Sequence, residues 1–206
     1  MSHRQGRARI LRLLVAALAL NLLGAAALAA PKTRDPAQVP AGTYELDPKH
    51  ASLIVRVMHM GFSRYTMRLR TLSGGFAYDP ADWQSGKVTI VIDPKSIDTE
   101  DAPFNKTIAG WFEPDKYPTI EFVGTGLKAT GAQQGELTGD LTFHGVTRPV
   151  TLSVVFNGAG PGLLGGVRLG FSGSGHIDRS DFHVTAMRDY VGDQVDLEFE
   201  VEFFRK

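Results

Sequence analysis

The stretch Val195–Phe203, VDLEFEVEF, decides the fold class of this chain. Its odd-numbered residues are all apolar and its even-numbered residues are all acidic. Successive side chains of a β-strand point to opposite faces, whereas a helix would spread these residues around its circumference. The stretch therefore predicts a strand with one apolar face and one face in water.

Similar strand patterns recur along the chain, separated by turns rich in glycine, proline and aspartate. Many short strands at regular spacing favour an antiparallel sandwich or barrel. We predict an all-β antiparallel fold of about eight strands. Besides the C-terminal stretch, the predicted strands lie at 52–58, 65–70, 88–92, 120–124, 137–143, 150–156 and 167–172.

One segment, near residues 99–112, lacks the two-residue period. Thr99 or Asp101 is placed to cap a helix, and Pro103 suits its first turn. Apolar residues then follow at spacings near three and four and so share one face, namely Phe104, Ile108, Trp111 and Phe112. We predict a short helical insertion whose aromatic face covers one end of the sheet structure.

The N-terminal residues have the features of an export signal. Four arginines precede an apolar run, Leu13–Ala30, and Ala27–Ala29 fits the small-x-small cleavage pattern. We predict a cleaved signal peptide at 1–29, a proline-bearing linker at 30–42 and one domain at 43–206. An uncleaved anchor stays open as an alternative, because the run is about long enough to span a bilayer.

The composition excludes several classes of chemistry. The chain has no cysteine, so disulfides, thiolate zinc sites and cysteine nucleophiles are absent. It contains 22 basic and 22 acidic residues, and the leader holds four of the basic ones and no acidic one. The remainder is acidic by about four charges and lacks the basic surface that binding to nucleic acid requires.

Two glycine-rich stretches resemble nucleotide or hydrolase motifs but do not meet their requirements. A nucleophile elbow starting at Gly170 would need glycine where Ser174 stands, and it would need a strand-to-helix turn. The stretch Gly160–Gly165 matches G-x-G-x-x-G, but a strand pattern follows it instead of a helix. We interpret the first stretch as a glycine-rich strand or bulge and the second as a flexible hairpin loop.

Histidine and aspartate occur two residues apart at His176 and Asp178 and again at Asp181 and His183. Zinc sites use such side chains, but the wet face of any strand gives the same spacing. We therefore predict no metal site, no cofactor and no catalytic residue. A hydrolase or isomerase that uses His59, Asp181 and His183 remains the enzymatic alternative.

The interior of a small barrel is either filled by side chains or holds one ligand. Strands 52–58 and 88–92 are apolar on both faces, and an elongated apolar cavity is consistent with this composition. A filled core, in a protein that binds a partner on its surface, remains the other possibility. Our candidates for lining or gating a cavity are Phe62, Phe76, Phe104, Trp111, Phe112, Phe122 and Phe143.

Several motifs in register resemble the YceI-like family over residues 43–204. They are TYELDPKHAS (43–52), VMHMGFS (57–63), SIDT (96–99), WFEPDKYPTIEF (111–122), GDLTFHGVTRPV (139–150), IDRSDF (177–182) and VGD (191–193). The resemblance implies a lipocalin-like β-barrel in the periplasm that carries a polyisoprenoid or another lipid. It further implies a protein that is not an enzyme, that forms homodimers and that contacts membranes only transiently.

The chain departs from the family pattern at three places. The helical insertion reads FNKTI at 104–108, where the family commonly has an aspartate and histidine pair. His183 follows the RSDF motif, where glycine is common, and the stretch 65–70 is rich in arginine. These departures leave the head group of the ligand open.

Overall fold

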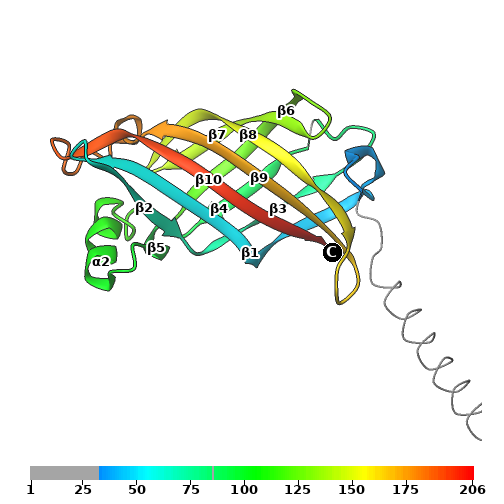
Figure 1. Ribbon diagram of the computed structural model, residues 1–206, viewed down its shortest axis with the longest axis horizontal. Coiled ribbons are helices and arrows are strands. Elements are labelled where there is room, and N and C mark those ends of the chain that lie inside the picture. The colour runs from blue at the N-terminus through cyan, green and yellow to red at the C-terminus, as the bar shows by residue number, and fades with distance from the viewer. Residues whose placement is uncertain (1–32, 85) are drawn as a thin grey trace, which may run out of the picture. The chain divides into compact units, whose positions relative to one another are not determined.

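Strands dominate the computed structural model, which describes residues 33–84 and 86–206 (Figure 1). In this part of the chain ten strands form one antiparallel sheet. The first strand, β1 (Gly42–His59), pairs with the last, β10 (Val191–Arg205), and so closes the sheet into an eight-stranded barrel. The predicted all-β barrel is confirmed, and the predicted signal peptide lies outside the described residues.

The barrel wall runs β1, β3, β4, β6, β7, β8, β9, β10 and back to β1. The β2 strand pairs with the second half of β1, and the two-residue β5 pairs with β2, so both lie beside the closed wall. The remaining bounds are β2 (Ser63–Leu69), β3 (Leu72–Tyr78), β4 (Val88–Ile92), β5 (Ile97–Asp98), β6 (Ile120–Ala129), β7 (Gln134–Phe143), β8 (Val146–Pro161) and β9 (Val167–Asp178).

The alternation in β10 orients its side chains as predicted. Its apolar residues from Leu197 to Phe203 line the inside of the barrel. Its acidic residues face outward, and three of them form ion pairs with arginines of β1, β2 and β9, in the pairs Glu198–Arg56, Asp196–Arg64 and Glu202–Arg168. One face of β10 therefore packs against apolar groups inside the barrel and the other faces water, as a period of two requires.

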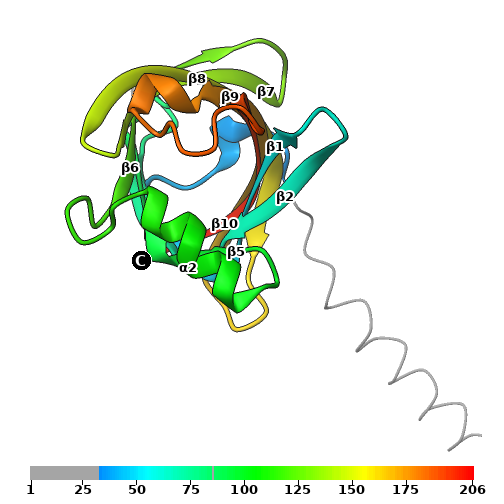
Figure 2. The ribbon, with the colours of Figure 1, turned by 90° about the vertical axis from the view of Figure 1, so that its left-hand side faces the viewer.

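The predicted helical insertion is α2 (Ala102–Trp111), which lies across one end of the barrel (Figure 2). The Asp101 carboxylate accepts a hydrogen bond from Phe104 N at 3.1 Å and caps the helix. Ile108 and Ala109 are buried against the barrel core. Asn105 ties the helix to β5, because its side chain accepts from Thr99 N at 2.7 Å and donates to Asp98 at 3.2 Å.

The His144–Gly145 pair forms the turn between β7 and β8. Both residues have positive φ, 50° and 76°, and the ring of Tyr117 packs where a β-carbon on Gly145 would lie. His144 Nδ1 lies 3.1 Å from the Phe182 carbonyl, and Nε2 lies 2.9 Å from Glu113 as an ion-pair contact outside hydrogen-bond geometry. The turn thus connects the helix end to the short 3₁₀ helix η3 (Arg179–Phe182).

Residues 33–41, which the sequence marks as a linker, lie against the barrel at the end away from α2 (Figure 1). They include the 3₁₀ helix η1 (Pro36–Gln38) and the buried Val39. Tyr44 Oη donates to Pro40 O at 2.8 Å, and Tyr78 Oη donates to Pro36 O at 2.5 Å. Burial raises the pKa of both tyrosines, which keeps these hydroxyls protonated.

A second 3₁₀ helix, η2 (Pro94–Ser96), connects β4 to β5. In the described part of the chain, no helix combines the length and the apolar character needed to cross a membrane.

Candidate ligand cavity

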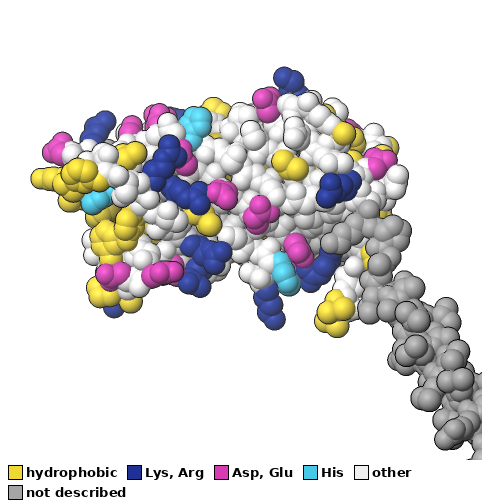
Figure 3. All heavy atoms as spheres, viewed as in Figure 1, with side chains coloured by type: hydrophobic (Ala, Val, Ile, Leu, Met, Phe, Trp, Pro, Cys, Tyr) yellow, Lys and Arg dark blue, Asp and Glu magenta, His cyan; other side chains and the backbone are white. Residues whose placement is uncertain are grey.

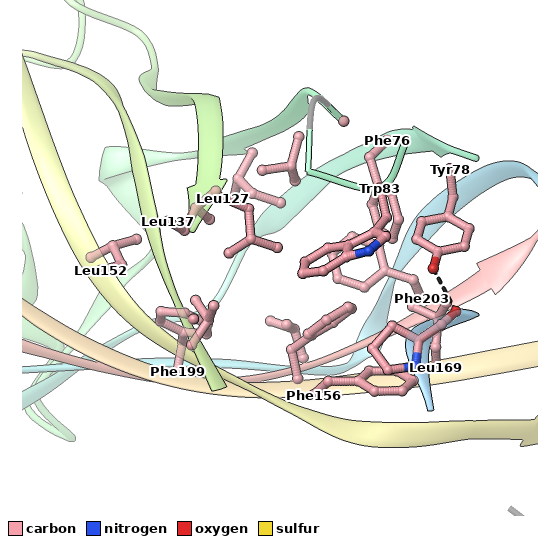
Figure 4. A pocket seen from close by; sticks show the side chains of 18 of the residues that line it. Phe76, Tyr78, Trp83, Leu127, Leu137, Leu152, Phe156, Leu169, Phe199 and Phe203 are labelled. Carbon is pink, nitrogen blue, oxygen red and sulfur yellow. Dashed lines mark hydrogen bonds between the residues drawn. The ribbon is translucent and has the colours of Figure 1, made fainter. Parts of the chain in front are cut away.

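A cavity of about 440 Å³ lies inside the barrel between its middle and η1 (Figure 4). This volume falls within the range of about 300–1,000 Å³ that is usual for small-molecule sites. The barrel is therefore not filled by its own side chains. The α2 end is closed instead by a packed group that includes Ile108, Phe143 and Phe182.

The cavity wall is almost entirely apolar because every strand of the closed barrel turns its apolar parity inward. These side chains are Leu53, Leu72, Phe76, Val88, Ile90, Ile92, Phe122, Leu127, Leu137, Leu141, Val150, Leu152, Val154, Phe156, Leu169, Phe171, Leu197, Phe199, Val201 and Phe203.

Phe76 is the centre of an aromatic cluster on one side of the cavity. Its ring stacks on Tyr44 with centroids 5.5 Å apart and meets Phe203 edge-to-face at 5.0 Å. It also contacts Phe171 at 6.3 Å, and Phe171 in turn contacts Phe156 at 5.4 Å. Rings in such arrangements attract one another beyond the effect of their buried area, so these contacts stabilise this side of the wall.

Glycines in the wall make room for rings that lie flat against it. A β-carbon on Gly173 would stand 2.1 Å from the Phe199 ring, and one on Gly139 would stand 2.5 Å from the Phe122 ring. The glycine-rich stretch around Gly173 lies in the strand β9, one of the two predicted possibilities, and its glycines leave room for aromatic rings to cover it.

The polar groups of the cavity gather at its mouth, near η1. Asp35, Tyr78, Trp83, Gln133 and Gln134 lie there, beside apolar atoms of Pro36 and Ala37. Figure 4 shows Trp83 and Tyr78 at this end, with the hydrogen bond from the tyrosine hydroxyl. Among the described lining residues there is no lysine, arginine or histidine, so the only charge is the negative one of Asp35.

Of the seven predicted lining residues, Phe76 and Phe122 line the cavity. Phe62 is 83% exposed at the turn between β1 and β2. The others pack at the α2 end, where Phe104 meets Trp111 at 6.5 Å and Phe112 meets Phe143 at 5.2 Å. Aromatic character, on which the prediction rests, does not specify the direction of a side chain.

Sequence reasoning missed Trp83 and the residues of η1 as the mouth of the cavity. Trp83 stands in a turn without strand periodicity, and residues 35–39 have the composition of a linker. The inward residues of β8, β9 and β10 could be identified from the sequence as lining residues, because the two-residue period marks which side chains of each strand are apolar.

The histidine and aspartate residues of the enzymatic alternative do not converge. In the described part of the chain, no hydrogen bond joins the side chains of His59, Asp181 and His183, and none of the three lines the cavity. No group of three or more His, Cys, Asp or Glu side chains with metal-binding geometry occurs among the described residues.

The clearest polar cluster lies around Asp47 on β1. Arg168 lies 2.7 Å and His50 lies 2.8 Å from the Asp47 carboxylate, which also accepts from Lys49 N at 3.0 Å. Burial raises the pKa of Asp47, but these hydrogen bonds outweigh burial and lower it to about 2. Asp47 is thus a permanently charged anchor at neutral pH and not a proton donor.

Comparison with known proteins agrees with this architecture. The model of the YceI-like domain matches residues 44–203. The UPF0312 protein of Vibrio vulnificus (strain YJ016) is 36% identical over 170 residues, which cover 81% of this chain and 89% of that protein. The UPF0312 protein of Pseudomonas savastanoi pv. phaseolicola is 33% identical over 171 residues, with 81% and 86% covered.

Solved structures share the barrel. BcnA of Burkholderia cenocepacia superimposes with a TM-score of 0.67 at 26% identity, over 76% of this chain and 98% of that one. A polyisoprenoid binding domain of Saccharophagus degradans, described as implicated in plant cell wall breakdown, gives 0.60 at 18% identity, over 79% and 98%. The second likeness concerns the fold alone.

Proposed function

The chain belongs to the YceI-like family, and on this basis we propose that it is a carrier that holds one long apolar chain, a polyisoprenoid or similar lipid, inside its barrel. The observation that supports this proposal is the 440 Å³ cavity with an apolar wall and polar groups only at its mouth. The domain of Saccharophagus degradans described as binding polyisoprenoids has the same fold.

Burial of hydrocarbon supplies the affinity in this proposal. Each methylene moved from water into an apolar cavity contributes about 0.8 kcal/mol, so a long chain needs few polar contacts. The wall offers no polar side chain that would have to be desolvated below the mouth. An elongated ligand therefore enters with its apolar end towards Leu141 and Leu152 and keeps its head near Trp83.

The charge at the mouth selects the head group. No lysine or arginine among the described lining residues is available to neutralise a phosphate, and the Asp35 carboxylate repels one. Gln133, Gln134 and Trp83 offer amide and indole groups suited to an uncharged oxygen. The proposed ligand is therefore a chain with a neutral head, such as an alcohol or a carbonyl compound.

The proposed place of action is the periplasm, supported by the signal-like leader and by the family. A homodimer is part of the same family-based proposal. The enzymatic alternative has no support from the geometry around His59, Asp181 and His183, so the proposed activity is binding without catalysis.

The cavity can be filled by one substitution whose control lies next to it. Val154 faces the cavity and is paired in register with Gly135 on one neighbouring strand and with Gly173 on the other. Ser153 follows the opposite parity and is exposed. We expect V154W to reduce binding of a fluorescent isoprenoid alcohol by at least about tenfold, whereas S153W retains it.

Native mass spectrometry of the protein extracted from its own membranes and periplasm gives the direct test. The expected spectrum shows one bound lipid per barrel, and V154W shows less of it than S153W. A barrel that is consistently empty, together with equal binding by the two variants, would refute the carrier function. An isoprenoid phosphate that binds more tightly than the alcohol would refute the neutral head group.

A further inference from the structure

The turn between β8 and β9 presents two leucines to solvent. Leu163 and Leu164 are 91% and 99% exposed, the highest values among the large apolar side chains of the described residues. The turn is held by hydrogen bonds from Gly162 N to Gly166 O and from Gly165 N to Gly162 O, both 3.0 Å. The leucines therefore extend from a formed turn, and their exposure is not caused by a loose segment.

This turn, which we call the leucine turn (Gly162–Gly166), lies at the mouth end of the barrel, away from α2 (Figure 1). The β8 strand below it forms a bridge between Ala159 and Thr33, which directly precedes the η1 segment. A β-carbon on Gly158 would stand 2.9 Å from Thr33 O, so the contact is close. The mouth of the cavity and the leucine turn thus belong to one face of the molecule.

Basic side chains without an ion pair surround the base of the leucine turn. Arg34 packs beside Gly158, and Arg205 packs beside Gly42 at the start of β1. Lys49 lies two residues after Asp47, which pairs with Arg168, and the Arg168 side chain packs beside Gly162 of the turn. Within the described ranges none of these three forms a salt bridge, whereas Arg168 and Lys206 are paired with Asp47, Glu202 and Glu45. The face combines apolar tips with unpaired positive charge, and none of these three basic residues lines the cavity.

We propose that the leucine turn docks the protein on an anionic lipid bilayer, with Leu163 and Leu164 inserted among the acyl chains. Arg34, Lys49 and Arg205 lie at the depth of the lipid head groups and meet their negative charge. Docking brings the cavity mouth to the membrane surface, where an apolar ligand can pass between bilayer and barrel. This last step rests on the proposed function, but the docking itself does not.

A second exposed apolar group, at the opposite end, serves as a matched control. Met60, Phe62, Met187 and Tyr190 lie on the β1–β2 turn and the loop after η3, which are joined by a hydrogen bond from Met60 N to Tyr190 O. Apolar side chains gather visibly at this end in Figure 3. This group lies far from the cavity mouth. If exposed apolar side chains bound membranes wherever they lie, this end would bind as well, so it tests whether position matters.

Because the chain has no cysteine, single labels can report on each end separately. We would label L163C and F62C with an environment-sensitive nitrobenzoxadiazole group, in protein that begins at Ala30, and add vesicles of phosphatidylethanolamine and phosphatidylglycerol. The label at 163 should shift to the blue and brighten, while the label at 62 should not change. An unchanged label at 163, or an equal response at 62, would overturn the proposal.

Vesicle flotation tests the same assignment without a label. L163S/L164S should partition to these vesicles at least about tenfold less, because each exposed leucine loses its apolar transfer. M60S/F62S should partition as the parent does, and R34Q/R205Q should lose binding that depends on phosphatidylglycerol. Loss of partitioning by M60S/F62S but not by L163S/L164S would overturn the proposal.

The two proposals fail in different measurements. Binding of the isoprenoid alcohol in vesicle-free solution should be equal in L163S/L164S and the parent. If the alcohol does not bind but the label at 163 still enters vesicles, docking stands and the carrier function falls. If the alcohol binds and the label stays in water, the carrier function stands and docking falls.

Discussion

At the scale of single residues, Arg179 is the most buried charged side chain of the described chain, at 6% exposure. Its guanidinium donates to the carbonyls of Gly192, Val184, Ala186 and Val191 at 2.7–2.9 Å. Burial lowers the pKa of Arg179, but it retains its donors and uses them to hold the loop before β10. Arginine suits this position because its fork of donors reaches several carbonyls at once.

We expect R179M to destabilise the protein by about 3 kcal/mol, because four carbonyls lose a charged donor. The stability of R179K should lie between those of the parent and R179M, because one ammonium group cannot reach all four carbonyls. Urea unfolding followed by circular dichroism measures both. If R179M unfolds at the same urea concentration as the parent, the loop carbonyls are satisfied by water and the interpretation is wrong.

The lowered pKa of Asp47 predicts that the folded protein loses stability in acid. Its pKa of about 2 in the folded protein lies below the usual 3.8, so folding favours the ionised form. The difference corresponds to about 2 kcal/mol of stability. This contribution is fully present above about pH 4 and disappears as the pH falls towards 2.

The D47N variant isolates this effect. It should be less stable than the parent at neutral pH, and the difference should shrink between about pH 4 and pH 2. Unfolding in urea at a series of pH values measures it, with E45Q on the same strand as the control. A constant difference across that range would show that Asp47 acts through packing and not through its charge.

At the scale of elements, the position of α2 depends on one amide side chain. Asn105 bonds both Thr99 N and Thr99 Oγ1 at 2.7 Å and donates to Asp98, so it locks the helix to β5. We expect N105A to cost about 1–2 kcal/mol and to speed hydrogen exchange in α2. K106A, on the exposed face of the same helix, should do neither. Equal exchange in the two variants would contradict this role.

The elements were predictable where local pattern sufficed. The acidic alternation of β10 and the capped helix after Asp101 needed only neighbouring residues. Strand lengths were harder, because β1 extends over 18 residues, with β10 on one side and first β3 and then β2 on the other. The role of residues 35–39 could not be predicted, since it depends on the hydroxyl group of Tyr78, which donates to Pro36 O from a position 42 residues later in the chain.

Dependence on contacts between distant residues also limits what the sequence predicts about the cavity. Parity predicted which face of each strand is apolar, but not whether the enclosed space is filled. Glycines at 139 and 173 hold rings flat against the wall, and this depends on which residues meet across strands. Phe62 points into solvent because it lies on the β1–β2 turn, where positive φ angles at Met60 and Gly61 reverse the chain.

At the scale of the whole molecule, ligand and stability are coupled. A ligand that binds only the folded barrel raises the free energy of unfolding by about 2.7 kcal/mol at a concentration one hundred times its Kd. We expect delipidation to lower the melting temperature and re-addition of ligand to restore it. V154W should show no such dependence, while L163S/L164S should show it in full. A melting temperature unaffected by delipidation in the parent would contradict the coupling.

The pairing of β1 with β10 also determines when the barrel can close during folding. The partner of β1 (Gly42–His59) is the fifteen-residue β10 (Val191–Arg205), which follows all the other strands of the barrel in sequence. Contacts between segments so far apart in sequence make folding slow. A chain that emerges N-terminus first keeps its apolar inner faces uncovered until β10 is free to pair with β1. Throughout that interval it is exposed to aggregation, and protection by chaperones matters most for this stage of its life.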